Sequence, residues 1–161
     1  MATAVGAAKR ADLAEVERLF AKVLEELRYN NALSKEHEAA KYSVRALQKK
    51  LAGDRYSILV AKARRDNNKV IGFCFNHFDD FTIWIEWFGV ATEERRKGVG
   101  QALLRQAFVT AQKRGAHKVW CDCRTTNQPS YNVLTKSGFR QIATVKNHWY
   151  GQDFILWERF V

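Results

Sequence analysis

The chain contains little that would interrupt a compact fold. It has one proline, Pro129, among 161 residues, and its nine glycines are scattered, so no linker or low-complexity segment divides it. No apolar run approaches the roughly 18 residues that a membrane-spanning helix needs. The first 20 residues carry Asp12, Glu15 and Glu17, which do not fit a secretory or transit peptide. We therefore expect one domain over residues 1–161 of a cytoplasmic protein that makes no membrane contact.

Cysteine is also scarce, with only Cys74, Cys121 and Cys123. An odd count without a secretory signal favours reduced thiols over disulfides. In a strand, Cys121 and Cys123 share one face, and no second pair of Cys or His stands at ligand spacing. The sequence thus predicts no metal site.

Acidic residues are the minority, because 27 Lys and Arg stand against 17 Asp and Glu and give a formal net charge of +10. This charge attracts phosphate groups, acidic substrates or nucleic acid, and it repels polycationic substrates. The basic residues are spread along the chain and no RNA-binding motif is present, so a nucleic-acid partner is not expected.

Hydrophobic periodicity predicts two helices near the N-terminus. Asp12 and Glu15 form a capping pattern for a helix that reaches about Arg28, and Ser34 can cap a second helix that reaches about Leu51. Later segments with a period of two predict strands. The expected strands are Thr3–Ala8, Tyr56–Ala63, Lys69–Phe78, Phe81–Val90, His117–Cys123, Phe139–Val145 and Phe154–Phe160, and the expected later helices are Gln101–Lys113 and one from Pro129 to Gly138. This order predicts an α/β fold with a mixed sheet.

The most informative segment is a basic loop between a strand and a helix. The first backbone N–H groups of a helix have no intrahelical partner, and the helix dipole favours negative charge there. Glycines at this point let a ligand approach the amides, and three cations attract anions. This segment therefore predicts a site that binds a pyrophosphate group, which we call the pyrophosphate cradle. It consists of Arg95, Arg96, Lys97, Gly98, Val99, Gly100 and Gln101.

Several motifs together resemble the GNAT superfamily of acyl-CoA-dependent N-acyltransferases. Arg95, Gly98 and Gly100 match its [Arg/Gln]-x-x-Gly-x-[Gly/Ala] signature, and Asn127 precedes Gly138-Phe139 at the family spacing. The closing hairpin 149–157 is also similar, as is the opening Ala11-Asp12-Leu13. The segment Val119–Asn127 resembles ribosomal-protein-alanine N-acetyltransferases.

The resemblance implies a GNAT fold, with a mostly antiparallel mixed sheet of about seven strands, about four helices, and a gap between strands 4 and 5. It implies that acetyl-CoA enters this gap and places its thioester near Val90 and Ala91. Asn127 and Ser130 are further expected contacts. The expected reaction transfers the acetyl group to a primary amine, either a protein N-terminus or a neutral or acidic small molecule, in a monomer or homodimer.

Two carboxylates are candidates for the base that removes the amine proton. Glu86 lies four residues before Val90, so strand alternation places both on one face, and Trp84 and Trp87 on opposite faces. The resemblance to ribosomal-protein-alanine N-acetyltransferases implies a base at the Asp122 position, and strand alternation places Asp122 opposite the two cysteines. The structural alternatives are a solvated surface position for Glu86 and, for Asp122, a pairing with Arg124 or a hydrogen bond to a loop amide. The sequence leaves the choice open.

The expected acid departs from the family pattern. The tyrosine that many members carry seven residues after the Asn falls on Leu134, which cannot donate a proton. Tyr131, Tyr150 or water are the remaining candidates for protonating the CoA thiolate. The missing tyrosine also leaves an acyl-CoA sensor without turnover as an alternative function, beside a basic nucleic-acid or ribosome-binding protein.

Overall fold

A seven-stranded sheet forms the centre of the protein in a computed structural model that describes residues 3–28 and 30–161. The strands are β1 (Thr3–Ala7), β2 (Ile58–Ala63), β3 (Lys69–Asp79), β4 (Thr82–Val90), β5 (Lys118–Arg124), β6 (Arg140–Val145) and β7 (Phe154–Phe160). Their spatial order is β1-β2-β3-β4-β5-β7-β6, and β4 and β5 are the parallel pair. The mixed α/β architecture expected from the sequence is confirmed.

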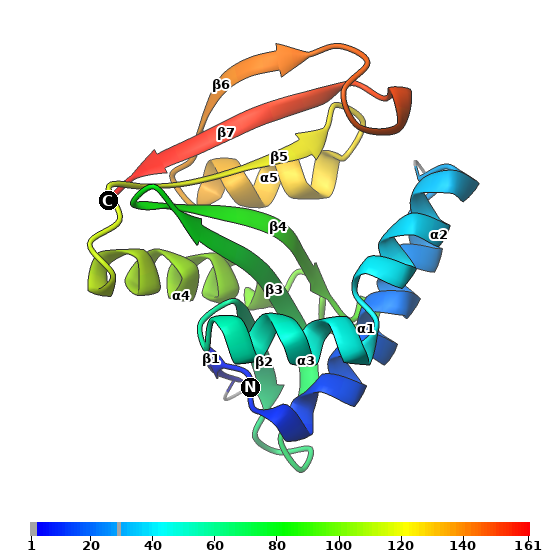
Figure 1. The fold of residues 1–161 in the computed structure, drawn as a ribbon, viewed down its shortest axis with the longest axis vertical. Coiled ribbons are helices and arrows are strands. Elements are labelled where there is room, and N and C mark those ends of the chain that lie inside the picture. The colour runs from blue at the N-terminus through cyan, green and yellow to red at the C-terminus, as the bar shows by residue number, and fades with distance from the viewer. Residues whose placement is uncertain (1–2, 29) are drawn as a thin grey trace.

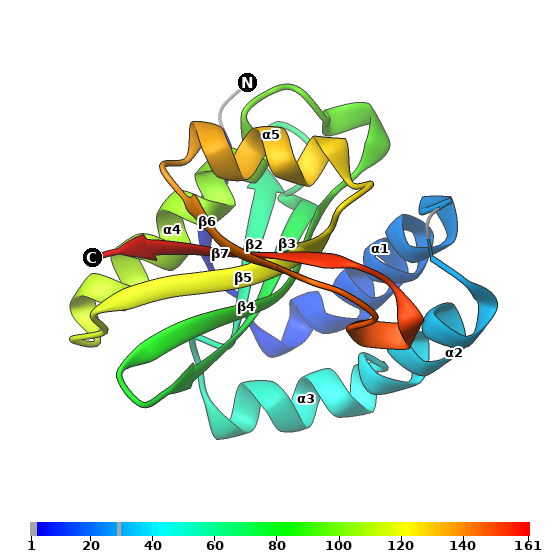
Figure 2. The same ribbon diagram turned by 90° about the horizontal axis from the view of Figure 1, so that it is seen from above.

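Helices cover both faces of the sheet (Figure 1, Figure 2). The helices are α1 (Leu13–Glu26), α2 (Ala32–Lys41), α3 (Val44–Gly53), α4 (Val99–Lys113) and α5 (Gln128–Lys136), and the short 3-10 turns are η1 (Arg10–Asp12), η2 (Thr92–Glu94) and η3 (Trp149–Gly151). One core cluster lies under α4 and α5. The second lies under α1 and α3 and contains the predicted apolar stripe of α1.

The second predicted helix differs from the sequence expectation in two details. The segment expected as one helix from Ser34 to Leu51 forms two, because the chain turns at Tyr42 and a new helix starts after Ser43. The cap of α2 is Asn31, whose Oδ1 accepts a hydrogen bond from the Ser34 N–H at 2.9 Å. The fold therefore has five α-helices among its described residues instead of about four.

The capping pattern predicted at Asp12 and Glu15 is wrong. The Asp12 side chain accepts a hydrogen bond from the Lys9 N–H at 2.8 Å and pairs with Lys62 at 2.6 Å. Its backbone closes η1 in a helical conformation, so its carboxylate does not cap α1.

A β-bulge at Glu86 changes which side chains share a face of β4. Phe75 of β3 is opposite Trp87, but the next residue, Asn76, is opposite Ile85, so Glu86 is the extra residue. Before and after the bulge, Ile85 and Val90 pack on the α4 side, whereas Trp87 packs on the α1 side. Glu86 and Val90 therefore lie on opposite faces.

The same bulge places Trp84 on the face of Trp87. The two expectations from simple alternation, that Glu86 shares a face with Val90 and that the two tryptophans do not share one, are both wrong for this physical reason.

Candidate active site

A cleft opens where β4 and β5 separate. The two strands pair from Thr82–Lys118 to Ile85–Cys121, and their later residues diverge. A cleft of about 1260 Å³ lies at this position, lined by both strands, by the first turns of α4 and α5, by α2 and by η3. The gap expected between the fourth and fifth strands is thus confirmed. The cleft has two ends, which differ in their chemistry.

The first end is the start of α4. Gly98 has φ of +84° and directly precedes the helix, and a Cβ there would meet no atom within 4 Å. Gly98 and Gly100 line the cleft together with Arg95, Arg96 and Gln101. Val99 contributes its backbone, because its side chain is buried in the core. Open space beside unpaired helix amides fits a phosphate group.

The cations of this loop have individual partners. The Arg95 guanidinium donates to the Val90 carbonyl at 3.1 Å and pairs with Glu26 at 2.9 Å, which fixes the loop to α1. Lys97 pairs with Glu94 at 3.3 Å. A Cβ on Gly100 would lie 3.5 Å from Val133 Cγ2, so this glycine also lets α5 pack close to α4.

The other residues expected around the pantetheine arm occupy different positions. Val90 lines the cleft, whereas Ala91 is buried and donates its N–H to the Ile71 carbonyl at 2.9 Å. Asn127 and Ser130 both line the cleft, and Asn127 Oδ1 accepts the Ser130 N–H at 3.2 Å. Asn127 therefore caps α5 beside the opening between the strands.

Asp122 lies at the second end, on β5. Its side chain is 12% exposed, and its Oδ2 accepts a hydrogen bond from Trp149 Nε1 at 2.8 Å and lies 3.8 Å from His148 Nε2. Burial raises the pKa of Asp122 above its usual value, while the Trp149 hydrogen bond and the nearby His148 and Arg124 oppose that rise. The arrangement favours a carboxylate with more than ordinary basicity.

Glu86 lies close to Asp122 in the sheet. Ile85 and Cys121 are the last paired residues, and both point into the α4 core, so Glu86 and Asp122 come next on the opposite face. Lys50 Nζ from α3 lies 2.8 Å from Glu86 Oε2, and both side chains are about one-fifth exposed. Glu86 is therefore a paired carboxylate.

The two tyrosines that are candidates for the acid, Tyr131 and Tyr150, lie in different surroundings. The Tyr131 ring packs edge-on against Trp157 at 5.1 Å, and its hydroxyl accepts a hydrogen bond from Gln141 at 3.1 Å. It is not among the cleft-lining side chains of the described residues, whereas Tyr150 is. Leu134 is completely buried in the core under α4 and α5. The Tyr131 hydroxyl is thus directed to Gln141 of β6 in this structure.

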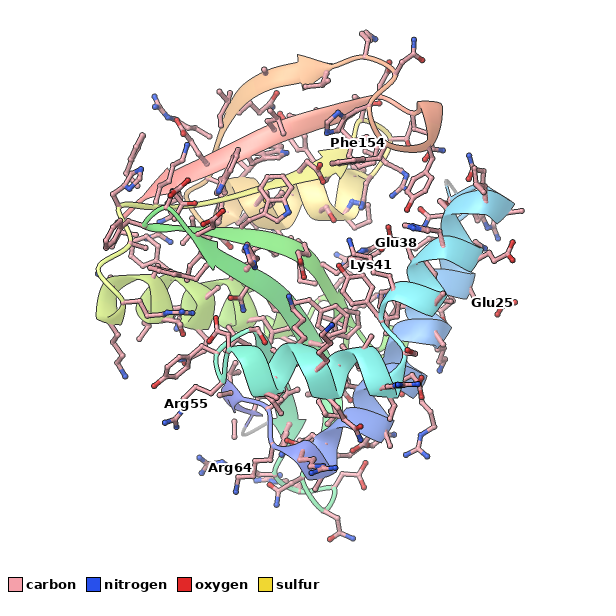
Figure 3. The ribbon with its side chains drawn as sticks, viewed as in Figure 1. Glu25, Glu38, Lys41, Arg55, Arg64 and Phe154 are labelled. Atoms are coloured by element: carbon pink, nitrogen blue, oxygen red, sulfur yellow. The ribbon has the colours of Figure 1, made fainter. Side chains whose placement is uncertain are left out.

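One carboxylate of the site was missed by the sequence reading. Glu38 is 7% exposed on α2, and it accepts hydrogen bonds from Trp87 Nε1 at 2.9 Å and from the Tyr150 hydroxyl at 2.6 Å. Figure 3 shows Glu38 and Lys41 directed from α2 toward the sheet, with Phe154 of β7 across the gap. Glu38 lies in a polar helix of ordinary pattern, so no local signal announces its burial.

The described residues contain neither a metal-binding cluster nor a membrane-spanning helix. No group of three or more His, Cys, Asp or Glu side chains there could hold a metal ion. Among the same residues, the helices are all too short or too polar to cross a membrane.

Known proteins share parts of this sequence. The streptothricin acetyltransferase of Streptomyces lavendulae is 36% identical over 55 residues, which cover 34% of this chain and 29% of that protein. An N-alpha-acetyltransferase of Sulfurisphaera tokodaii is 37% identical over 71 residues, which cover 42% of this chain and 41% of that protein. The chain thus spans less than half the length of these curated relatives.

Solved structures share the whole fold. The PaiA N-acetyltransferase of Thermoplasma acidophilum, in complex with coenzyme A, superposes with a TM-score of 0.84 at 18% identity and full coverage of both chains. The ribosomal-protein-S18-alanine N-acetyltransferase of Escherichia coli gives 0.72 at 17% identity, covering 99% of this chain and 94% of that one. The family model described as the acetyltransferase (GNAT) family matches residues 17–139. With that match over most of its length, the chain belongs to the GNAT family of acetyltransferases.

Proposed function

We propose that the protein is an acetyl-CoA-dependent N-acetyltransferase that acts on a primary amine in a ternary complex. One observation carries the proposal: the cleft between β4 and β5 connects the open start of α4 to the buried carboxylate of Asp122. The reaction requires a site for the phosphates of acetyl-CoA and a base for the amine proton. This cleft connects an anion site to a carboxylate of raised pKa.

The α4 end suits the pyrophosphate of acetyl-CoA. The open side of Gly98, the helix amides and Arg96 supply an anion site, and Arg95 holds the loop in place through Glu26. The backbone of β4 beyond Ile85 is unpaired with β5 and offers hydrogen bonds to an extended arm. Bound there, acetyl-CoA supplies an activated acetyl group to the acceptor.

Asp122 is the base in this proposal. An amine must lose its proton before it attacks a thioester carbonyl, and a carboxylate whose pKa is raised by burial takes that proton more readily. Trp149 holds one oxygen of the carboxylate, Oδ2, which fixes its orientation. The ion pair with Lys50 makes Glu86 a weaker candidate for the same step, since its carboxylate oxygen is already engaged by the Lys50 ammonium at 2.8 Å.

Protonation of the leaving thiolate falls to Tyr150 or to water. Tyr150 lines the cleft, and burial together with Glu38 raises its pKa, so the hydroxyl keeps its proton at neutral pH. In the free protein this hydroxyl donates its hydrogen bond to Glu38, another cleft residue, at 2.6 Å. A thiolate is stable enough to leave without an enzyme acid.

The acceptor is a protein N-terminus or a small amine. One relative carries the name N-alpha-acetyltransferase and another is named for streptothricin, so the relatives support both classes. The net charge of +10 disfavours polycations. An acyl-CoA sensor without turnover is the alternative, which Leu134 in the family's tyrosine position favours.

The test has two steps. Calorimetric titration with acetyl-CoA measures binding, and a screen of peptides, amino acids and small amines measures the release of the CoA thiol. The proposal expects binding and acetylation of one acceptor class. Binding with no acetylation of any acceptor supports the sensor, and absence of binding contradicts both.

A further inference from the structure

One face of the sheet continues from Asp122 without a helix that covers it. Side chains alternate along β5, and Cys121 and Cys123 pack into the core under α4 and α5, so Trp120 and Asp122 lie on the other face. Figure 1 and Figure 2 show α5 against the first face of β5, β7 and β6, and within residues 3–28 and 30–161 no α-helix lies against the second face of these three strands. The candidate base therefore lies at the edge of an uncovered surface.

The strand register defines what this surface presents. Trp84 of β4 is opposite Trp120 of β5, and their rings meet edge to face with centroids 4.7 Å apart. Trp120 precedes Asp122 by two residues, so their Cα atoms are about 7 Å apart along the strand. The register with β7 adds the neighbours on the same face. We call this surface the open sheet face, and it consists of Trp84, Lys118, Trp120, Leu156, Glu158 and Phe160.

Much of the open sheet face is apolar and reaches solvent. Trp84, Trp120 and Leu156 are half-buried, and Phe160 is 54% exposed. Trp84 also lines the cleft, so the cleft and the open sheet face are continuous. Large aromatic side chains left partly exposed beside a cleft offer apolar area to a ligand that extends out of it.

The far side of the open sheet face carries an excess of positive charge. Lys118 and Arg140 both pair with Glu158, at 3.3 and 2.7 Å, so two cations share one carboxylate. The Lys118 ammonium lies 4.7 Å from the centre of the Trp120 ring, and the Arg140 guanidinium lies 5.2 Å from that of Phe160. A ligand that crosses the two tryptophans therefore meets a margin that favours an acidic group.

The opposite exit from the cleft is occupied by contacts between η3 and α2. The Tyr150 hydroxyl lies 2.7 Å from His37 Nδ1 and donates to Glu38 at 2.6 Å. The Asn31 amide also donates to the Tyr150 carbonyl at 3.4 Å. These contacts hold η3 against α2, so an acceptor with its amine at Asp122 extends over the open sheet face instead.

We propose that the open sheet face binds the peptide chain that follows an N-terminal amine, with an apolar third residue on Trp120. The inference rests on the proposed function, because Asp122 fixes where the amine lies. Alternate residues of an extended peptide are also about 7 Å apart, so the third residue reaches Trp120 and the fifth reaches Lys118. An acidic fifth residue suits the positive margin there. A small amine does not span both positions, so this surface selects a polypeptide acceptor.

The test uses peptides that share a first residue, the one that the acceptor screen favours. One series lengthens the acceptor from the amide of that residue to three and then five residues. Matched five-residue peptides carry leucine or glycine at the third position, and glutamate or glutamine at the fifth. For each acceptor we measure kcat/KM of acetylation. Separately, calorimetry measures peptide binding in the presence of CoA, which has no acetyl group to transfer.

We expect at least a tenfold preference for leucine over glycine in kcat/KM and in affinity, because the leucine side chain leaves water for an apolar surface. Trp120→Ala should reduce this ratio to within about twofold, since the platform is lost. Phe108→Ala is the matched control, because Phe108 is a half-buried aromatic residue of α4 beneath Arg159, outside the open sheet face. It should preserve the ratio.

A second variant tests the charge without loading the core. The Arg140 side chain is 69% exposed, and glutamine in its place keeps a donor for Glu158. We expect a preference of about threefold for glutamate over glutamine at the fifth position, because exposed charges interact weakly. Arg140→Gln should reduce that preference and leave the preference for leucine intact. If Trp120→Ala fails to fold, this comparison decides the proposal.

The outcomes separate the two proposals. Equal binding and turnover of the leucine and glycine peptides, or an unchanged preference in folded Trp120→Ala, overturns the peptide surface while acetylation itself stands. A dimer in sedimentation that Trp120→Ala dissociates places a second copy on the open sheet face and also overturns it. If acetyl-CoA binds and no amine is acetylated, the proposed function fails, and calorimetry with CoA alone decides the surface.

Discussion

Trp149 Nε1 donates a hydrogen bond of 2.8 Å to Asp122 Oδ2, so the turn between β6 and β7 holds the carboxylate of β5. The hydrogen bond stabilises the ionised form and lowers the pKa of Asp122, against the larger effect of burial, which raises it. The basicity of this group is therefore a balance between burial, which raises its pKa, and nearby groups that lower it, of which the Trp149 indole has the largest effect.

That balance predicts a shift in the pH profile of Trp149→Phe. A base must be ionised to act, so the rate rises as pH passes the pKa of Asp122. Loss of the indole N–H removes a stabiliser of the ionised form, and the rising limb of kcat/KM moves to higher pH. Trp120→Phe is the control, because its N–H donates to Thr82 at 3.2 Å, and it should not move the limb. If the rising limb shifts equally in both variants, the assignment of Asp122 as the base is contradicted.

Replacing each carboxylate by its amide tests which one is the base. Asp122→Asn should lower kcat by roughly 10²–10⁴-fold at neutral pH with little change in acetyl-CoA affinity. Glu86→Gln should lower kcat far less, because Glu86 is already paired with Lys50. Steady-state kinetics and acetyl-CoA titration of both variants give the answer, and near-normal turnover in Asp122→Asn rules Asp122 out.

Asp122→Asn should also change the free energy of unfolding in a pH-dependent way. Because its folded pKa is raised, Asp122 favours folding at low pH, and that contribution is lost as pH rises through the folded pKa. Asp122→Asn should thus gain stability over the wild type as pH approaches neutrality. Asp153 has the opposite sign, since Lys146 and the Asn147 N–H lower its pKa. Asp153→Asn should lose stability at neutral pH and match the wild type in acid, as measured by thermal unfolding.

Local sequence signals predicted the sheet because each strand carries its own hydrophobic periodicity. The loop Arg95–Gln101 was equally readable, since glycine and cation spacing are local properties. The face of Glu86 was not, because the bulge in β4 depends on its pairing with β3. One extra residue there reverses the alternation that relates Glu86 to Val90.

Long-range contacts account for the rest of what the sequence did not reveal. Glu38 is buried only because Trp87 and Tyr150, 49 and 112 residues away, converge on it. The break between α2 and α3 likewise depends on Glu17, which accepts the Val44 N–H at 2.7 Å from another helix. No periodicity within residues 30–53 encodes these partners.

The glycine at the start of α4 predicts a loss of acetyl-CoA affinity in Gly98→Val. The side chain would fill the open space beside the helix amides, and we expect affinity to fall at least tenfold, about 1.4 kcal/mol. Gly115→Val controls for backbone strain, because Gly115 has φ of +68° at the other end of α4, and valine is disfavoured at both positions. Calorimetry should show normal affinity in Gly115→Val. Wild-type affinity in Gly98→Val contradicts the cradle.

The last prediction concerns the acid that protonates the CoA thiolate, and it rests on Tyr131 and Leu134. Tyr131→Phe should keep turnover within about twofold of the wild type, because its hydroxyl bonds Gln141. Leu134→Tyr should destabilise the protein by about 1–3 kcal/mol and restore no acid, since a larger side chain must enter a packed core at a completely buried position. Thermal unfolding and thiol-release assays measure both effects. A marked fall in turnover for Tyr131→Phe at unchanged stability would mean that α5 rotates in the ternary complex and brings the hydroxyl into the cleft.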